Sequence, residues 1–252
     1  KNMKKRPELH SICITAKSGI MLFSADFEIG SRNYRSFGPL ITAMNDLSTR
    51  SVGAPVSYMV MSTIAITVVQ SEETGIKVII FHDASYYRTL AQCIATQILR
   101  VFLERFSAES LNLTDASNFK RFNSSLGIAI RSASNLILHD LIDKLRGAIQ
   151  FAVIFCDGDA IYTYPSNADS ISVAANLQQL QFALQEVANL TQDLPYELIV
   201  EGGQIFSHIV LFGATTVILQ IRAASHSQNV ITKVKETLSM LSLCFQTSES
   251  LA

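Results

Sequence analysis

The sequence predicts an α+β fold in which one set of strands and helices, in the order β-β-α-β-β-β-α, occurs twice. Residues 10–24, HSICITAKSGIMLFS, read as two short apolar runs joined by a polar turn, and residues 151–165, FAVIFCDGDAIYTYP, repeat that pattern. Each hairpin is followed by a stretch of helical periodicity, then by three runs rich in β-branched residues, and then by another helix. We therefore expect two antiparallel sheets flanked by helices.

The first half opens with a hairpin whose turn, Lys17-Ser18-Gly19, contains the glycine that such turns favour. Pro39 is well placed to begin the helix that follows, because a proline in the first helical turn needs no hydrogen bond from its nitrogen. The expected elements are strands over 10–16 and 19–25, a helix over 39–50, strands over 56–62, 64–72 and 75–83, and a helix over 86–106.

A long amphipathic stretch over 115–146 joins the two halves, with Gly127 as its weak point and Gly147 as its end. The predicted domains are accordingly 8–146, which includes this bridging helix, and 147–252. The expected elements of the second half are strands over 151–157 and 159–165, a helix over 170–192, strands over 196–202, 205–213 and 216–223, and a helix over 229–245.

The composition is poor in charge. Hydrophobic residues make up 48% of the chain and charged residues 16%, the net charge is -1, and tryptophan is absent. A net charge of -1 gives no positive electrostatic potential that would attract nucleic acid. A surface with so few charged residues is often covered by a partner protein. The basic opening, residues 1–6, is either a solvated tail or a contact with an anionic membrane, and no signal peptide follows it. Residues 205–221, the least charged stretch, fit two buried strands better than a membrane helix.

The cysteines indicate neither a metal site nor a redox pair. Cys13, Cys93, Cys156 and Cys244 lie far apart in apolar runs, and no CxxC spacing occurs. Buried thiols in a reducing compartment are the favoured interpretation, and we expect the chain to be cytoplasmic.

The other catalytic motifs are equally weak. His82-Asp83 and His139-Asp140 are either base-and-orienter pairs or ordinary structural and surface residues, and the second reading is favoured because no nucleophile motif accompanies them. No loop has the frame of a phosphate-binding motif. The carboxylate pairs Glu72-Glu73 and Asp157/Asp159 lie in predicted turns, where acidic residues are common. We expect no catalytic residue, no metal and no cofactor.

Since no catalytic motif is present, a protein-binding surface is the remaining candidate for a functional site. Leu40, Ile41, Met44 and Leu47 span a wide arc of the predicted helix over 39–50. Either all of them belong to an ordinary core, or one face packs on the sheet while the other contacts a partner. The apolar strand over 19–25 is a candidate edge strand, and such an edge tends to be paired or covered.

This order of elements resembles the longin fold, and residues 10–24 are similar to the opening hairpin of tandem-longin proteins. That superfamily comprises the Mon-one family, the Fuzzy planar-cell-polarity proteins and the Hermansky–Pudlak relatives. Residues 195–223 are similar to the second longin sheet, 117–142 occupy the place of the post-longin helix, and the loop over 27–37 is closer in length to Fuzzy. The resemblance covers nearly the whole sequence. Family members usually carry a third longin domain, and we expect that this sequence is either a shorter relative or a fragment.

The resemblance implies a non-catalytic subunit of a heterodimer of longin proteins that binds a Rab-type small GTPase and promotes nucleotide exchange. It implies a role in membrane trafficking or ciliogenesis, peripheral to endomembranes or the cilium base. The alternative is a longin scaffold or adaptor without exchange activity, and a small-molecule sensor would require a polar cavity. By position, the implied partner interface comprises Met21, Leu22, Phe23, Leu40, Met44 and Asn45.

Overall fold

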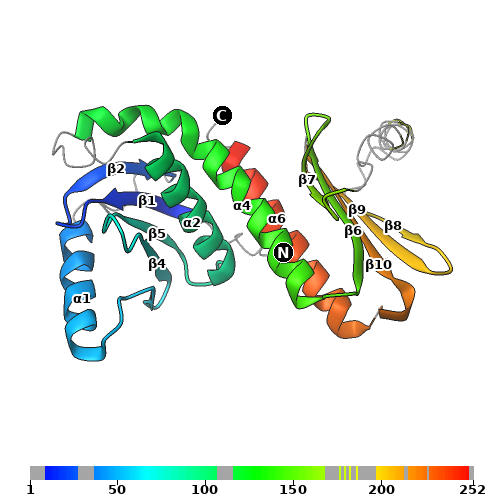
Figure 1. Ribbon diagram of the computed structural model, residues 1–252, viewed down its shortest axis with the longest axis horizontal. Helices are drawn as coiled ribbons and strands as arrows, with labels where there is room; N and C mark the ends of the chain where they lie inside the picture. Colours follow the sequence, from blue (N-terminus) through cyan, green and yellow to red (C-terminus); the bar gives the residue numbers. More distant parts are fainter. Residues whose placement is uncertain are drawn as a thin grey trace, which may run out of the picture. The chain divides into compact units, whose positions relative to one another are not determined.

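The computed structural model describes residues 9–27, 37–106, 116–167, 197–212, 215–225 and 227–249, and the single positions 176, 179, 182 and 186. The chain forms two compact units. The first comprises Lys1–Leu136 with Thr247–Ala252, and the second comprises Ile137–Gln246. Each unit holds one five-stranded sheet (Figure 1).

The first sheet is antiparallel, with the strand order β2-β1-β5-β4-β3. Its strands are β1 (Leu9–Thr15), β2 (Met21–Asp26), β3 (Tyr58–Val60), β4 (Ile64–Gln70) and β5 (Lys77–Asp83). The turn between β1 and β2 passes through Gly19 at φ 87°, a conformation that favours glycine. The strand predicted over 19–25 is therefore an edge strand, β2, as expected.

Helices flank both faces of this sheet. The helices of the first unit are α1 (Phe37–Val52), α2 (Arg88–Arg105), the 3-10 helix η2 (Ala116–Phe122) and α4 (Asn123–Lys144), which the first unit includes up to Leu136. On one face, Ile41 of α1 packs in a buried cluster with residues such as Cys13 and Phe81.

The opposite face of the sheet carries an aromatic cluster. Phe23 of β2 meets Phe122 of η2 edge to face, with ring centroids 5.3 Å apart. Phe102 of α2 contacts Phe106, Phe119 and Phe122, and all four rings are buried. These aromatic contacts attach α2 and η2 to the edge of the sheet at β2.

The second sheet repeats the first. Its antiparallel strands are β6 (Ile149–Cys156), β7 (Asp159–Tyr164), β8 (Glu197–Glu201), β9 (Ile205–Phe212) and β10 (Thr215–Arg222), in the order β7-β6-β10-β9-β8. The tight turn between β6 and β7 has Asp157 at φ 53° and Gly158 at φ 91°. After η3 (Ala223–Ser225), α6 (Gln228–Glu249) follows, and Phe245 on it contacts Phe212 of β9.

The predicted α+β fold with two antiparallel sheets is confirmed, and the differences are local. The helix predicted over 39–50 begins two residues earlier, since Gly38 and Pro39 both fit in its first turn. The strand predicted over 56–62 shortens to β3, because the nitrogen of Met61 already bonds the oxygen of Ile64 in the turn. The stretch predicted over 115–146 starts as the 3-10 helix η2, and α4 then continues through Gly127.

Two predictions cannot be compared in full with the structure, because they fall on residues outside the described ranges. The basic opening, 1–6, lies outside them. Of the helix predicted over 170–192, only four positions are described, and they are helical and exposed: Asn176, Gln179, Phe182 and Glu186. The predicted domain boundary after residue 146 stays a prediction, while the two compact units divide within α4, after Leu136.

Candidate functional site

Helix α1 carries apolar side chains on the face that is turned to solvent, in addition to those that pack on the sheet. Leu40 and Leu47 are 51% and 66% exposed, and Met44 between them is half-buried. These three residues follow i, i+4, i+7 spacing, so they form one stripe along the helix. We call this stripe the outer face of α1. Since an exposed apolar stripe is unfavourable in water, it marks a candidate contact surface.

The inner face of α1 packs Phe37 and Ile41 on the core and also buries polar groups. Its buried residues are Gly38, Ile41, Thr42 and Asn45, of which only Ile41 is large and apolar. The amide nitrogen of Asn45 donates to Oε1 of Gln70 at 3.0 Å, and its oxygen accepts from the backbone nitrogen of Val56 at 2.9 Å. Asn45 therefore fastens α1 to the sheet and to the chain that follows it.

A lysine lies buried at the same end of the sheet. Lys77, at the start of β5, is 2% exposed, and its Nζ donates to the backbone oxygen of Lys17 at 3.3 Å. Burial lowers the pKa of Lys77, and nearby Asp46 opposes that shift. The hydroxyls of Thr15 and Thr42, buried in the same unit, make no hydrogen bond within the described part of the chain. The polar layer beneath α1 is thus incompletely satisfied.

The structure separates the six predicted interface residues into two groups. Leu40 is exposed, and Met21 and Met44 are half-buried, so their side chains remain accessible. Leu22, Phe23 and Asn45 are 2%, 7% and 4% exposed, and they belong to the interior of the first unit. Leu47, which the sequence placed on the same helix but not in the interface, lies on the outer face.

His82 and Asp83, a candidate base-and-orienter pair for which the structural interpretation is favoured, do not pair through their side chains. The fully buried His82 donates from Nδ1 to the backbone oxygen of Asp83 at 2.8 Å, so its Nε2 accepts from the Thr67 hydroxyl at 3.0 Å. The Asp83 carboxylate instead contacts Nε2 of His10 at 2.9 Å. Burial lowers the pKa of His82. A neutral imidazole without access to solvent is a structural group and not a general base.

The other candidate catalytic groups are dispersed. His139 contacts Asp143 at 3.4 Å on an exposed helix surface, while its neighbour Asp140 pairs with Lys144. Glu72 and Glu73 lie in the turn between β4 and β5, and Asp157 lies in the turn before β7. Within the described residues, no group of three His, Cys, Asp or Glu side chains is arranged to hold a metal ion.

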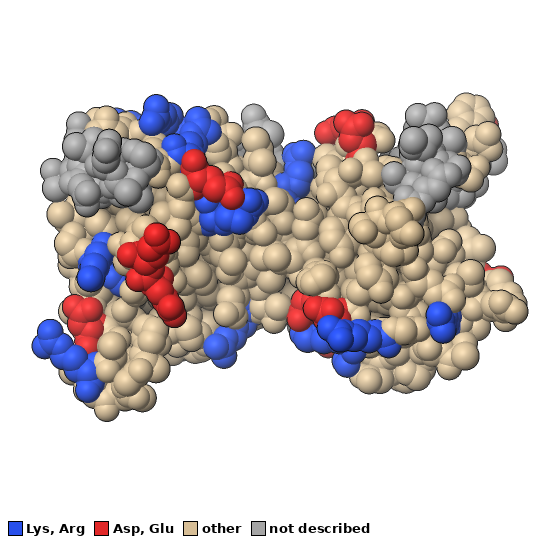
Figure 2. Space-filling model, viewed as in Figure 1, with Lys and Arg blue, Asp and Glu red and all other residues tan. Residues whose placement is uncertain are grey.

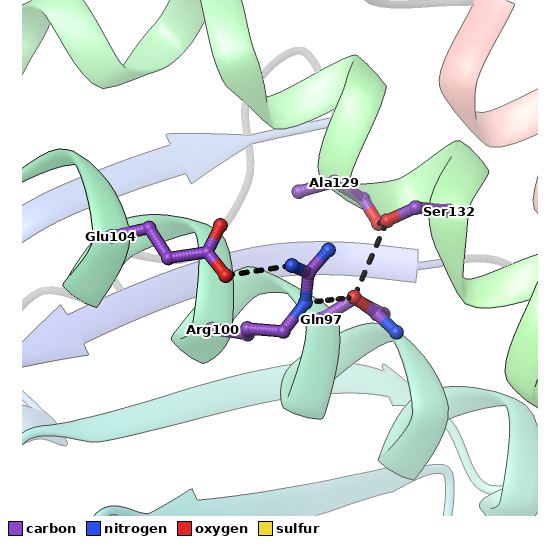
Figure 3. Close-up of polar contacts among 5 residues, drawn as sticks. All are labelled: Gln97, Arg100, Glu104, Ala129 and Ser132. Atoms are coloured by element: carbon purple, nitrogen blue, oxygen red, sulfur yellow. Dashed lines mark hydrogen bonds and ion pairs between the residues drawn. The ribbon is translucent and has the colours of Figure 1, made fainter.

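A polar seam joins α2 to the first half of α4 (Figure 3). Arg100 donates from Nε to Oε1 of Gln97 at 2.9 Å and from Nη1 to Oε1 of Glu104 at 2.7 Å. Across the seam, the Ser132 hydroxyl lies 3.5 Å from the same Gln97 oxygen and donates to the backbone oxygen of Ala129 at 2.8 Å. No local pattern in the sequence predicted this seam, because it joins residues of two helices that lie 35 positions apart in the chain.

None of the helices in the described ranges is long and apolar enough to span a membrane. The weakly charged stretch over 205–221 instead contains strands β9 and β10, as expected.

No protein family and no curated protein matches this chain. Among solved structures, MglB of Myxococcus xanthus is similar, with 15% identity and a TM-score of 0.40 over 45% of this chain and 95% of MglB. A structure of MglB with tetrameric arrangement shares 15% identity, with a TM-score of 0.40 over 48% of this chain and 93% of the other. The gliding protein MglB of Thermus thermophilus shares 14% identity, with a TM-score of 0.39 over 46% of this chain and 93% of that one.

Proposed function

We propose that this chain is a tandem-longin subunit related to the Mon-one, Fuzzy and Hermansky–Pudlak proteins. In this proposal it pairs with a second longin protein through the outer face of α1, and the pair regulates a Rab-type small GTPase in membrane trafficking or ciliogenesis. The observation that carries the proposal is the stripe of Leu40, Met44 and Leu47, in which both leucines are exposed, on a helix that already packs Phe37 and Ile41 on the sheet.

The proposed interface joins the outer face of α1 to the edge strand β2. Gly38 of α1 lies against the β1–β2 turn, since a Cβ on Gly38 would stand 3.3 Å from the oxygen of Gly19 and 3.5 Å from Cε of Met21. Ile20, which is 44% exposed, extends the apolar surface beside this contact. An edge strand next to an apolar helix suits a partner that adds main-chain hydrogen bonds and side-chain burial together.

The buried members of the predicted interface have a supporting role in this proposal. Phe23 holds β2 against η2, and Asn45 fixes α1 on the sheet. In this proposal Phe23 and Asn45 hold the partner-binding surface in position, and they do not contact the partner themselves. Burying the exposed half of each leucine would contribute about 1 kcal/mol to association.

Nucleotide exchange suits a protein that acts by binding. An exchange factor favours the nucleotide-free GTPase over the loaded form, so its effect is a difference in affinity between two states. It needs neither an acid, nor a base, nor a nucleophile of its own. We place the complex on the cytoplasmic side of endomembranes or at the cilium base, in keeping with the family resemblance.

Affinity purification of the tagged chain from its native cells, read by mass spectrometry, tests the pairing. We expect a second longin protein and a Rab-type GTPase among the stoichiometric partners. The double variant Leu40→Asp/Leu47→Asp should lose the longin partner by at least about 100-fold, because it places two carboxylates in an apolar contact. The matched control, Ile199→Asp/Val200→Asp, alters two similarly exposed residues of β8 and should retain it. Equal retention by both variants would remove the α1 interface from the proposal.

Release of a fluorescent nucleotide from the co-purified GTPase tests the activity. Acceleration by the complex, and not by the chain alone, is the expected result. A stable complex that leaves release unchanged would favour the scaffold alternative, since pairing would then persist without exchange.

A further inference from the structure

The first unit carries an asymmetry of charge that the proposed function does not use. Residues 116–136, which form η2 and the first half of α4, contain Lys120, Arg121 and Arg131 and no acid. Over the wider range 88–136, six lysines and arginines stand against three acids, whereas the whole chain has a net charge of -1. Figure 2 shows blue side chains gathered over the upper part of the first unit, with a red group among them.

Contacts bring two of these cations, Arg105 and Arg121, together where α2, η2 and α4 meet. Arg105, in the last turn of α2, donates to the hydroxyl of Ser125 on α4. The guanidinium of Arg121 lies over the ring of Phe106, 5.2 Å from its centroid. Arg105, Lys120 and Arg121 are exposed, and none of them takes part in an ion pair within the described chain.

An exposed isoleucine lies among these cations. Ile128 on α4 is 67% exposed. It follows Ser125, which accepts the hydrogen bond from Arg105, by three residues and precedes the half-buried Arg131 by three, and this spacing places residues on one side of α4. We call Arg105, Lys120, Arg121 and Arg131, with Ile128 between them, the basic patch.

We infer that the basic patch is a docking surface for an anionic phospholipid bilayer. Exposed cations gain by approaching acidic headgroups, and each contributes about fivefold to partition onto such a membrane. The isoleucine adds a shallow apolar contact at the level of the acyl boundary. An acidic protein partner would instead be expected to offer a matching apolar pocket and paired charges, and the single exposed Ile128 is a small target for one.

This inference goes beyond the proposed function, and its test needs neither a GTPase nor a second longin protein. The purified full chain is mixed with vesicles of phosphatidylcholine alone or with about 30 mol% phosphatidylserine, an anionic content at which surface attraction is strong. Flotation then measures the bound fraction. We expect binding only to the anionic vesicles, and we expect it to weaken as salt is raised, because screening shortens the reach of the field.

Two variants test the assignment to this surface. Lys120→Glu/Arg121→Glu should lower partition by at least about 25-fold, as two cations are lost. Ile128→Ser should lower it by a few-fold while the salt dependence stays the same. The matched control, Arg222→Glu/Lys235→Glu, makes the same change in net charge on exposed residues of the second unit and should bind as the parent does. Circular dichroism of every variant verifies that it is folded.

Several outcomes would overturn the inference. Failure of the parent chain to float with anionic vesicles is one, and equal loss in the control is another, because binding would then follow net charge alone. Undiminished binding by Lys120→Glu/Arg121→Glu, together with loss after removal of residues 1–6, would assign the membrane contact to the basic opening instead.

Discussion

The edge strands β2 and β7 occupy the same place in two sheets of identical order, yet their surroundings differ. Leu22 and Phe23 of β2 are buried, and Phe23 packs against Phe122. In β7, Asp159, Ala160 and Ile161 are exposed, and the remaining residues are half-buried. A shared chain order therefore does not determine how the side chains of an edge strand are covered. In the first unit η2, an element that lies outside the repeated pattern, covers one face of β2 through Phe122 and leaves its edge open to the proposed partner.

The largest expected change in stability comes from removing the aromatic contact between β2 and η2. Phe23→Ala should destabilise the first unit by about 3–5 kcal/mol, because it leaves a cavity beneath Phe122. Ile161→Ala, at the other edge strand, should cost less than about 1 kcal/mol, as that side chain is 37% exposed. Hydrogen exchange of the β2 and β7 amides, measured in both variants, separates local from global effects. Equal losses in the two variants would mean that the two edges are protected alike.

A smaller effect should follow from the buried imidazole of β5. His82 occupies the sixth position of this strand, where β10 has Gln220. Its folded pKa lies below its unfolded value, so the unfolded chain binds a proton that the folded chain does not. Stability therefore falls as pH drops below the unfolded pKa of about 6.5, by no more than about 1.4 kcal/mol per pH unit from this group.

The comparison with β10 supplies the variant for this prediction. His82→Gln gives β5 the residue of its counterpart and should remove that part of the pH dependence. Urea titrations of both proteins between about pH 5 and pH 8, the range in which an imidazole titrates, measure it. An unchanged slope in the variant would show that another group is responsible.

The smallest effect is expected at the first residue of the same two strands. β5 begins with the buried Lys77 and β10 with the buried Thr215. Replacing the ammonium by an apolar group of similar length, Lys77→Met, removes the cost of burying a charge and should stabilise the first unit by about 1 kcal/mol at neutral pH. Thermal unfolding tests this value, with Lys235→Met as the control at an exposed site of the second unit. A marked loss of stability would mean that the bond from Lys77 to the oxygen of Lys17 outweighs the cost of burial.

Periodicity sufficed to predict the sheets, because alternation and β-branched runs depend on local sequence. The stripe on α2 was also predictable, and its members Leu90, Ile94 and Ile98 are fully buried. Which face of α1 meets the sheet could not be predicted. Leu40, Met44 and Asn45 span an arc of the helix, and only the packing of the folded chain decides which of them are buried. The inward position of Asn45 depends on Gln70, 25 residues away, and no local pattern reveals such a partner.

The basic patch was equally hidden from local patterns. Arg105 and Arg121 are separated by 16 positions in the chain and are brought together by the packing of α2, η2 and α4. The uniform composition of the whole chain, with a net charge of -1, conceals this local excess of positive charge.

The position of the last strand inside each sheet has a consequence during synthesis. Strand β1 can pair with its second neighbour, β5, only after β5 has emerged from the ribosome. The same holds for β6 and β10, and in both cases the second neighbour follows roughly 60 residues later in the chain. At a synthesis rate of about 5–20 residues per second, an opening hairpin spends several seconds with its inner strand unpaired on one side. The apolar strands "LHSICIT" and "IQFAVIFC" are the inner strands that stay unpaired for this time. Both are therefore points where a nascent chain of this protein is most open to chaperones and to wrong partners.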